Sequence, residues 1–461
     1  MTKKSRNKKF SINEAVWKET PKITEPTYKI DEKPKSWWES LLYGWQHTLV
    51  DISPFVLPLA VAGAAGMTAL EKAQFINFCL FSMGIATIIQ TTIGNRLPII
   101  QGPSATLTGT IVPIAGQMGA PIMWGGIFVG GFIEMFIGVS RILKFLRQLF
   151  PPVVSGVVII CIGIALGQVA IRLMIGDGSP ANFAFAGVVI LLIFTLQIKF
   201  QKYLKGIISR GAIFFSIWIV GLGIAGIFGE VNWTLVTEKS WIEFPGLFPY
   251  GGPGFGWEFG IAAIFTIFVG YLGSMVESLG DYAATCAVCG ETYQVKHMNK
   301  GIFAEGLGSI VAAMFGGLPC TSYTQNIGII ATTRVASRFI VQIAALILIL
   351  YGLCPKFGAL LIAMPRSVIG GVFVIVCGMI VMSGIRLLSS APATNINFLL
   401  VGTTLICAIG IPVYANYVLG VEWLKQLPLL IKLFLTNTVV LAVILSVGLN
   451  LLLNIMMKGD G

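Results

Sequence analysis

The chain has 461 residues, of which 56% are hydrophobic and 11% are charged, against roughly 25% charged in an average soluble domain. With a mean hydropathy of +0.85, such a chain could not cover its own surface in water, so lipid must cover it. The net charge of +11 does not indicate a nucleic-acid partner, because ten of the 31 basic residues precede residue 36 and most others lie in short gaps between apolar runs.

Residues 1–44 are predicted to form a basic cytoplasmic tail. The first long apolar run begins only near Trp45, whereas a cleavable signal peptide would place its apolar region within the first ~30 residues. The eight cysteines fall almost entirely in apolar segments, where they behave as small buried hydrophobes. We therefore expect no metal and no cofactor.

The rest of the chain predicts an all-α polytopic membrane protein, since a spanning helix needs ~20 mostly apolar residues. About fourteen segments meet this description, near 45–66, 72–93, 97–117, 121–139, 151–171, 182–198, 211–228, 262–288, 301–317, 321–335, 337–353, 367–384, 395–412 and 431–457. With the N-terminus in the cytoplasm, thirteen Lys and Arg residues lie in inner gaps and seven in outer gaps. This excess predicts that both termini are cytoplasmic.

Two of these segments do not resemble ordinary spans. The third begins with Pro98 and runs through Gln101-Gly102-Pro103-Ser104, and the tenth begins with Pro319 and runs into polar residues. Such interrupted segments at matching places in two halves indicate a transporter binding site. They are third in each set of seven, and because seven is odd the second set must enter with opposite topology. The sequence therefore predicts a 7+7 inverted repeat with short extended stretches in segments 3 and 10.

Acidic side chains inside spans are costly and are candidates for function. Glu277 and Asp281 lie four residues apart in the eighth span, so they share a helical face. Their mutual repulsion favours a carboxyl that keeps its proton, which suits a group that binds and releases one. Glu305 and Glu134 are further acids that could instead be structural hydrogen-bond partners, an interpretation we favour for Glu134.

Gln325 and Asn326 lie at the start of the tenth segment. An amide donates and accepts at once, whereas an ionised carboxylate only accepts. Glu277 together with Gln325 therefore suits a heterocycle rich in N–H and C=O groups better than an inorganic anion. His47, at the cytoplasmic start of the first span, has either a structural or a direct role.

Three motifs resemble the nucleobase–ascorbate transporters, also called nucleobase–cation symporters, in their xanthine and uric acid branch. They are Gln46-His47, residues 277–282 (Glu-Ser-Leu-Gly-Asp-Tyr), and residues 325–334, where Gln, Asn, Gly, Thr and Arg match every fixed position of that family's signature. The resemblance covers about 45–457. One departure is Ala105, where many members have Phe to stack on the base.

The resemblance implies a core domain of 45–139 and 262–353 and a gate domain of 151–228 and 367–457, moving in an elevator-like step in a homodimer. It implies a substrate site between the broken segments, made by Glu277, Gln325, Ala105, Ser104, Thr324 and Asn326. Asp281, Glu305 and His47 would support that site or its proton coupling. In that family, Gln at position 325 accompanies transport of xanthine and uric acid, Glu accompanies transport of uracil, and Pro accompanies transport of ascorbate.

We therefore expect a nucleobase importer of the cell membrane, driven by proton symport, with Na⁺ coupling not excluded. Alternatives are a uracil, broad nucleobase or ascorbate symporter, and an uncoupled facilitator, which would not need the buried acid pair. An anion exchanger of related fold would offer mainly helix N-termini and cations at its site, rather than Glu277. A membrane enzyme would need a nucleophile–base or metal constellation, and no such pattern is recognisable in the sequence.

Overall fold

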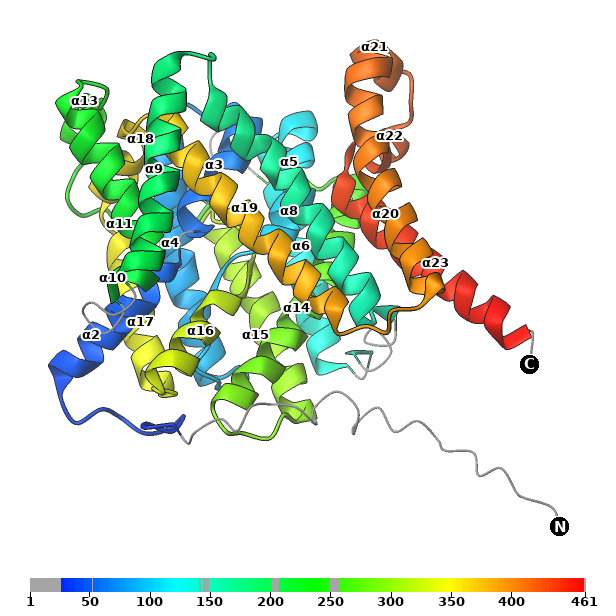
Figure 1. Ribbon diagram of the computed structural model, residues 1–461, viewed down its shortest axis with the longest axis horizontal. Helices are drawn as coiled ribbons and strands as arrows, with labels where there is room; N and C mark the ends of the chain where they lie inside the picture. Colours follow the sequence, from blue (N-terminus) through cyan, green and yellow to red (C-terminus); the bar gives the residue numbers. More distant parts are fainter. Residues whose placement is uncertain are drawn as a thin grey trace.

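The computed structural model describes residues 26–51, 53–140, 142–143, 149–200, 207–248 and 257–459. The tail before residue 26 and the basic stretches within 141–148 and 201–206, which carry part of the predicted inner charge, lie outside these ranges. The elements of the first half are α2 Trp37–Val50, α3 Ser53–Ala64, α4 Ala69–Thr92, β1 Gln101–Pro103, α5 Ala105–Met118, α6 Ala120–Val139, α8 Pro152–Ile175, α9 Pro180–Lys199, α10 Ile207–Arg210, α11 Ala212–Trp218, the π-helical η2 Ile219–Ile224, α12 Ala225–Ile227 and α13 Thr234–Thr237 (Figure 1).

The second half begins with the longest helix and ends with a bent pair. Its elements are α14 Ile261–Val288, α15 Val295–Met314, β2 Cys320–Ser322, α16 Thr324–Thr333, α17 Arg338–Gly352, α18 Pro355–Ala363, α19 Arg366–Ser389, α20 Asn395–Tyr414, the π-helical η3 Ala415–Leu419, α21 Gly420–Lys425, α22 Leu429–Thr436 and α23 Thr438–Gly459. Within the described ranges, seven helices are long and apolar enough to cross a membrane, or up to nine if each of two bent pairs is one span. The protein is therefore a multi-pass helical membrane protein, and the count of fourteen spans stays a prediction.

Some predicted segments differ from the helices. The first helix of the described residues begins at Trp37 rather than near Trp45, and Glu39 in its first turn favours this start because it faces the positive end of the helix. The segment 45–66 is divided between α2 and α3 near Asp51. The segment 431–457 bends by 87° between α22 and α23. Asn437 stabilises that bend, since its Oδ1 accepts from the backbone N–H groups of Val439 and Val440.

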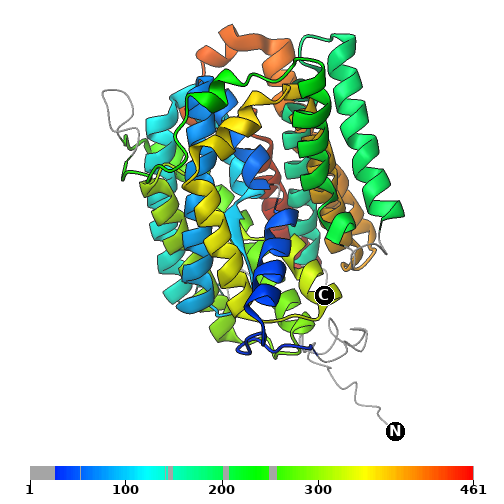
Figure 2. The ribbon, with the colours of Figure 1, turned by 90° about the vertical axis from the view of Figure 1, so that its left-hand side faces the viewer.

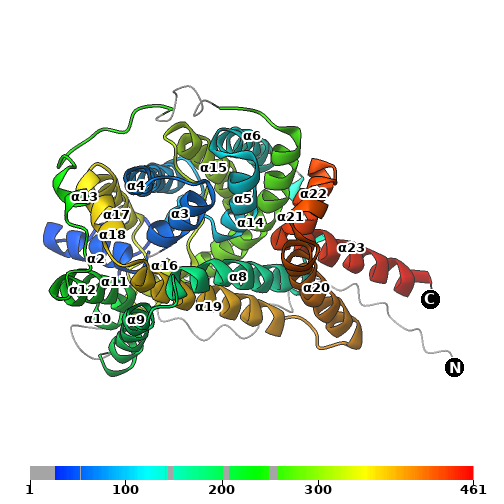
Figure 3. The ribbon, with the colours of Figure 1, turned by 90° about the horizontal axis from the view of Figure 1, so that it is seen from above.

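The helices form two layers. In one, α4 packs against α15, α17 and α18, and α6 packs against α15. In the other, α8 packs along α19, with α9, α11, α20 and α23 beside them. The layers are seen from the side in Figure 2 and from above in Figure 3, where α8 and α19 lie together on one side and α4, α6 and α15 on the other.

Glycines bring α6 and α15 into backbone contact. A Cβ placed on Gly306 would lie 2.4 Å from the backbone N of Met135, and one placed on Gly138 would lie 2.4 Å from the backbone N of Phe303. Only residues without a side chain permit this approach. The contact places side chains of α6 and α15 deep in the first layer.

The extended stretches of segments 3 and 10 pair with each other. Strands β1 and β2 are antiparallel, with Gln101 opposite Ser322 and Pro103 opposite Cys320. Backbone N–H groups of Ser104 and Tyr323 extend the pairing to Pro319 and Ile100 at 2.9 and 3.0 Å. Helices α5 and α16 therefore leave the strand pair at opposite ends.

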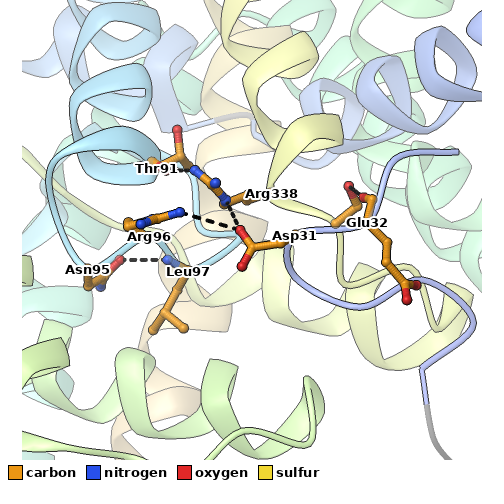
Figure 4. A network of polar contacts seen from close by, with 8 residues as sticks. Asp31, Glu32, Thr91, Asn95, Arg96, Leu97 and Arg338 are labelled. Carbon is orange, nitrogen blue, oxygen red and sulfur yellow. Dashed lines mark hydrogen bonds and ion pairs between the residues drawn. The ribbon is translucent and has the colours of Figure 1, made fainter.

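The first described residues cross the same end of the protein as the α16–α17 connection. Tyr28 forms a parallel bridge with Val335. Asp31 accepts from Nε of Arg338 at 2.6 Å and lies 3.6 Å from Arg96, while Arg338 also donates to the carbonyl of Thr91 (Figure 4). These contacts connect the amino-terminal segment to α4 and α17.

Candidate functional site between the strand pair and α14

One face of α14 carries a row of polar side chains. Ser274, Glu277, Ser278 and Asp281 follow the i, i+3, i+4, i+7 spacing that places residues on the same side of a helix. Their partners belong to the two interrupted segments. α14 therefore contacts both segments through one face.

The first interrupted segment contacts the N-terminal part of this row. Thr106 donates to Oε2 of Glu277 at 2.8 Å. The hydroxyls of Ser104 and Ser274 lie 3.3 Å apart, and Ser104 also caps α5 by accepting from the backbone N–H of Leu107. The positive end of α5 thus lies beside the Glu277 carboxyl, an arrangement that favours negative charge there.

The second interrupted segment contacts the row one turn further along. Ser322 and Thr324 each donate to Asp281, at 2.8 Å to Oδ2 and 2.8 Å to Oδ1. Ser278 and Thr321 are hydrogen-bonded at 2.8 Å. Both oxygens of Asp281 therefore have protein partners, and the residue is 5% exposed.

Three of the predicted site residues are half-buried, namely Ala105, Glu277 and Gln325. Among the described residues, Oε1 of Glu277 and the amide of Gln325 have no hydrogen-bond partner. Ala105 begins α5 and packs against the larger of the apolar clusters. These are the positions at which the site offers atoms to a ligand.

Asn326 belongs to a separate buried network. Its amide oxygen lies 2.7 Å from Nδ1 of His47, and its amide nitrogen donates to Asp51. Both ends of the side chain are thus used within the protein, as are the hydroxyls of Ser104 and Thr324. This arrangement favours a supporting role for Asn326 and His47, because their contact holds α16 against the end of α2.

The two remaining acids behave differently from each other. Glu305 accepts from Nε2 of Gln101 at 3.2 Å and from the backbone N–H of Ser322 at 3.1 Å, so it joins β1 to β2. Glu134 is 1% exposed, and within the described part of the chain neither of its carboxylate oxygens has a hydrogen-bond partner. The structural hydrogen-bond role favoured for Glu134 from the sequence is therefore wrong in this structure.

Two cavities lie along the seam between α5 and α8. One of ≈ 10 Å³ is lined by Thr106, Ile162 and Glu277 among others, which is too small for a heterocycle. The other, of ≈ 420 Å³, begins one helical turn away at Gly109 and Leu166 and extends to Arg172 and Tyr417. The small cavity beside Glu277 thus lies next to a larger one, while Thr324, in the second interrupted segment, is exposed.

Sequence reasoning missed the hydroxyl donors Thr106 and Ser322, the amide of Gln101 and the carboxylate of Asp51. The helical spacing of Ser274 and Ser278 with the two acids was a usable signal. The pairing of β1 with β2, which brings Ser322 to Glu305, had no signal in local sequence, because it joins residues far apart along the chain.

A profile described as "Permease family" matches residues 38–417. Uric acid permease PucJ of Bacillus subtilis (strain 168) is 30% identical over 90% of this chain and 92% of its own, and the xanthine permease of the same organism is 30% identical over 91% and 95%. The transmembrane domain of a cyanobacterium bicarbonate transporter, BicA, shares the fold, with a TM-score of 0.55 at 15% identity over 91% of this chain and 98% of that one. The chain therefore belongs to the permease family that includes xanthine and uric acid permeases, and it is a membrane transporter rather than an enzyme.

Proposed function

We propose that the protein imports an oxidised purine, xanthine or uric acid, by secondary active transport. The observation that carries the proposal is that α14 joins both interrupted segments and leaves only Oε1 of Glu277 and the amide of Gln325 unpartnered among the half-buried site residues. The curated relatives named as xanthine and uric acid permeases support the same substrate class.

The two groups complement the edge of a purine dione. Glu277, ionised, accepts hydrogen bonds from ring N–H groups, and Gln325 both donates to a ring carbonyl and accepts from a second N–H. Thr106 orients the Glu277 carboxyl by occupying its other oxygen. Ala105 leaves space where a larger side chain would cover the base.

A two-domain elevator agrees with the packing. If each of the first seven segments is matched to one of the second seven, α4 corresponds to α15, α6 to α17 and α8 to α19. Exchanging the two halves turns the contacting pair α4–α17 into the pair α15–α6, which is also in contact. The same exchange turns the pairs α8–α19 and β1–β2 each into itself. This symmetry supports the inverted repeat, with core domain 45–139 and 262–353 and gate domain 151–228 and 367–457.

In this scheme the core carries the substrate past the gate. The seam between α5 and α8 is also the boundary between the two domains, and the ≈ 420 Å³ cavity lies on it. With cytoplasmic termini, as the distribution of basic residues favours, this cavity opens outward and would admit substrate toward Glu277. We place the protein in the cell membrane as a homodimer, with proton symport as the driving process.

A competition panel tests the substrate class. Uptake of labelled xanthine into cells expressing the protein is measured against xanthine, uric acid, uracil and ascorbate as competitors. Inhibition by the two oxidised purines at lower concentrations than by uracil or ascorbate is expected. Stronger inhibition by uracil would assign the uracil alternative, and absence of uptake of both labelled xanthine and labelled uric acid would reject the proposal.

A further inference from the structure

Glu134 is the acid that the proposed substrate site does not use. It lies on α6 on the same face as Gly131 and Gly138, at spacings of i−3 and i+4, and this face is in backbone contact with α15. Gly306, the α15 residue at that contact, directly follows Glu305. The carboxyls of Glu134 and Glu305 therefore flank one helix–helix contact, and Glu305 is the charged group that acts on Glu134.

This place holds several oxygen atoms that lack a partner. Side-chain oxygens that are buried and without a hydrogen bond in the described structure include both of Glu134 and Oε1 of Gln101. Nε2 of Gln101 donates to Oε1 of Glu305 at 3.2 Å, so the amide oxygen of Gln101 belongs to the same cluster. All three residues are 0–1% exposed.

Two buried carboxylates cannot both stay ionised without a compensating cation. The ion pairs within the described residues are both formed by Asp31, at the far end of the amino-terminal segment, so no Lys, Arg or His among them neutralises the pair. The other titratable groups that face it are acidic or neutral: Tyr271, Tyr282 and Asp281 on α14 and Cys320 on β2. The cluster has acceptors in excess and lacks a positive charge.

We propose that Glu134 and Glu305, with Gln101, bind the monovalent cation, H⁺ or Na⁺, that drives transport. Intramembrane acids that face the interior of a bundle mark such pathways. Glu134 and Glu305 lie on α6 and α15, whereas the base-reading groups lie on α14 and α16. This proposal rests on the proposed function, because the cation is the one coupled to purine uptake.

The strand pair connects the cation to the substrate. Oε1 of Glu305 receives bonds from both strands, through Gln101 and the backbone of Ser322, and Ser322 in turn donates to Asp281 on α14. Neutralising Glu305 with a cation weakens these charge-assisted bonds, and losing the cation strengthens them. Occupancy thus changes how firmly β1 and β2 are held beside Glu277 and Gln325.

The test uses Glu134→Gln in the full chain, purified and reconstituted in proteoliposomes. The amide keeps the volume and can donate permanently to Glu305, so it replaces the cation. Base-induced thermal stabilisation and xanthine–xanthine exchange should persist, while the accumulation ratio should fall to about 1, because no cation gradient is then coupled to the base. Ser367→Ala, which removes a buried unpartnered hydroxyl on α19, is the matched control and should accumulate as the unmodified protein does.

Two arms identify the cation. A pH gradient without Na⁺, or a Na⁺ gradient at equal pH, is applied to the unmodified protein and to Glu134→Gln. Accumulation by the unmodified protein in one arm and its loss in the variant support the proposal. Two results would overturn the proposal and leave the purine assignment intact. One is normal accumulation by Glu134→Gln, and the other is exchange without accumulation by the unmodified protein in both arms.

A second variant covers misfolding. If Glu134→Gln does not bind xanthine, Glu134→Asp is assayed, since it retains a carboxyl. It should still accumulate xanthine above equilibrium, and intact exchange without accumulation in that variant would overturn the proposal. If the unmodified protein neither exchanges nor binds any purine, the proposed function itself fails, which is a different result.

Discussion

The two interrupted segments have nearly the same backbone and different side-chain chemistry. Both place a three-residue strand before a helix, and the strands pair directly. The first donates one hydroxyl, from Thr106, to Glu277, whereas the second donates two, from Ser322 and Thr324, to Asp281. Asp281 is therefore held through both of its oxygens, whereas Glu277 is held through one and keeps Oε1 unpartnered.

The difference extends to the helix ends. Helix α5 begins with a side-chain cap from Ser104, while α16 has no such cap and presents Gln325 in its first turn. Tyr323 of the second segment crosses β1 and donates to the carbonyl of Pro103, and a Cβ on Gly102 would lie 2.6 Å from that ring. A shared frame thus supports two tasks: the second segment anchors α14, and the two together leave Glu277 and Gln325 for the ligand.

The largest effect is expected for Glu277→Gln. The amide has one oxygen where Glu277 offers Oε1 to the base and Oε2 to Thr106, so one N–H group must face a donor, and the remaining bond is no longer charge-assisted. Loss of a charged hydrogen-bond acceptor costs about 1.5–3 kcal/mol per bond, so xanthine binding and uptake should fall on the order of 100-fold. Xanthine binding to purified protein, with expression and folding checked by size-exclusion chromatography, measures this. Wild-type binding in the variant would remove Glu277 from the substrate site.

Gln325→Glu should change selectivity. The purine dione edge offers both N–H and C=O, and an ionised carboxylate would leave the C=O facing another acceptor. An unpaired buried polar group costs about 1–3 kcal/mol, so xanthine and urate affinity should fall roughly tenfold to a hundredfold, and uracil affinity less. Inhibition constants for the three bases decide this, with Gln325→Asn as the control that keeps the chemistry and shortens the reach. Equal losses for all three bases would mean that Gln325 supports the backbone break.

Thr106→Val should have a smaller effect, because it removes the hydroxyl that orients Glu277 and not the carboxyl itself. A hydrogen bond to a charged group is worth about 1.5–3 kcal/mol, and only part of that is transmitted to the base, so a loss of about threefold to tenfold in xanthine affinity is expected. Thr106→Ser retains the hydroxyl and should behave almost as the unmodified protein. Equal losses in both variants would show that the methyl group matters, and not the bond to Glu277.

The comparison also shows what the sequence could reveal. Composition, span length and the Pro-rich starts of segments 3 and 10 were sufficient to predict a multi-pass helical protein and to select Glu277 and Gln325. The bend at Asn437 was not predicted, because side-chain capping by one polar residue has no hydrophobic period. The roles of Asp281, Asn326 and Glu134 depended on which partners lie opposite them, and those partners are 41 to 279 residues away for the first two.

Asp281→Asn should affect stability more than affinity, in contrast to Glu277→Gln. Both oxygens of Asp281 accept hydroxyls from the second interrupted segment, so the residue anchors β2 and α16 to α14. Asparagine keeps one acceptor, and the other hydroxyl must rotate to accept from the amide, which replaces a charge-assisted bond by a neutral one. The free energy of unfolding should fall by about 1–3 kcal/mol, while xanthine affinity should change by no more than about threefold, since less than 0.7 kcal/mol is expected to reach the base. Thermal unfolding and xanthine binding on the same preparation measure both quantities, and Ser278→Ala, which removes a neighbouring bond to Thr321, is the matched control. A large loss of affinity with unchanged stability would place Asp281 in contact with the base or the cation, and the two interrupted segments would then share the same task.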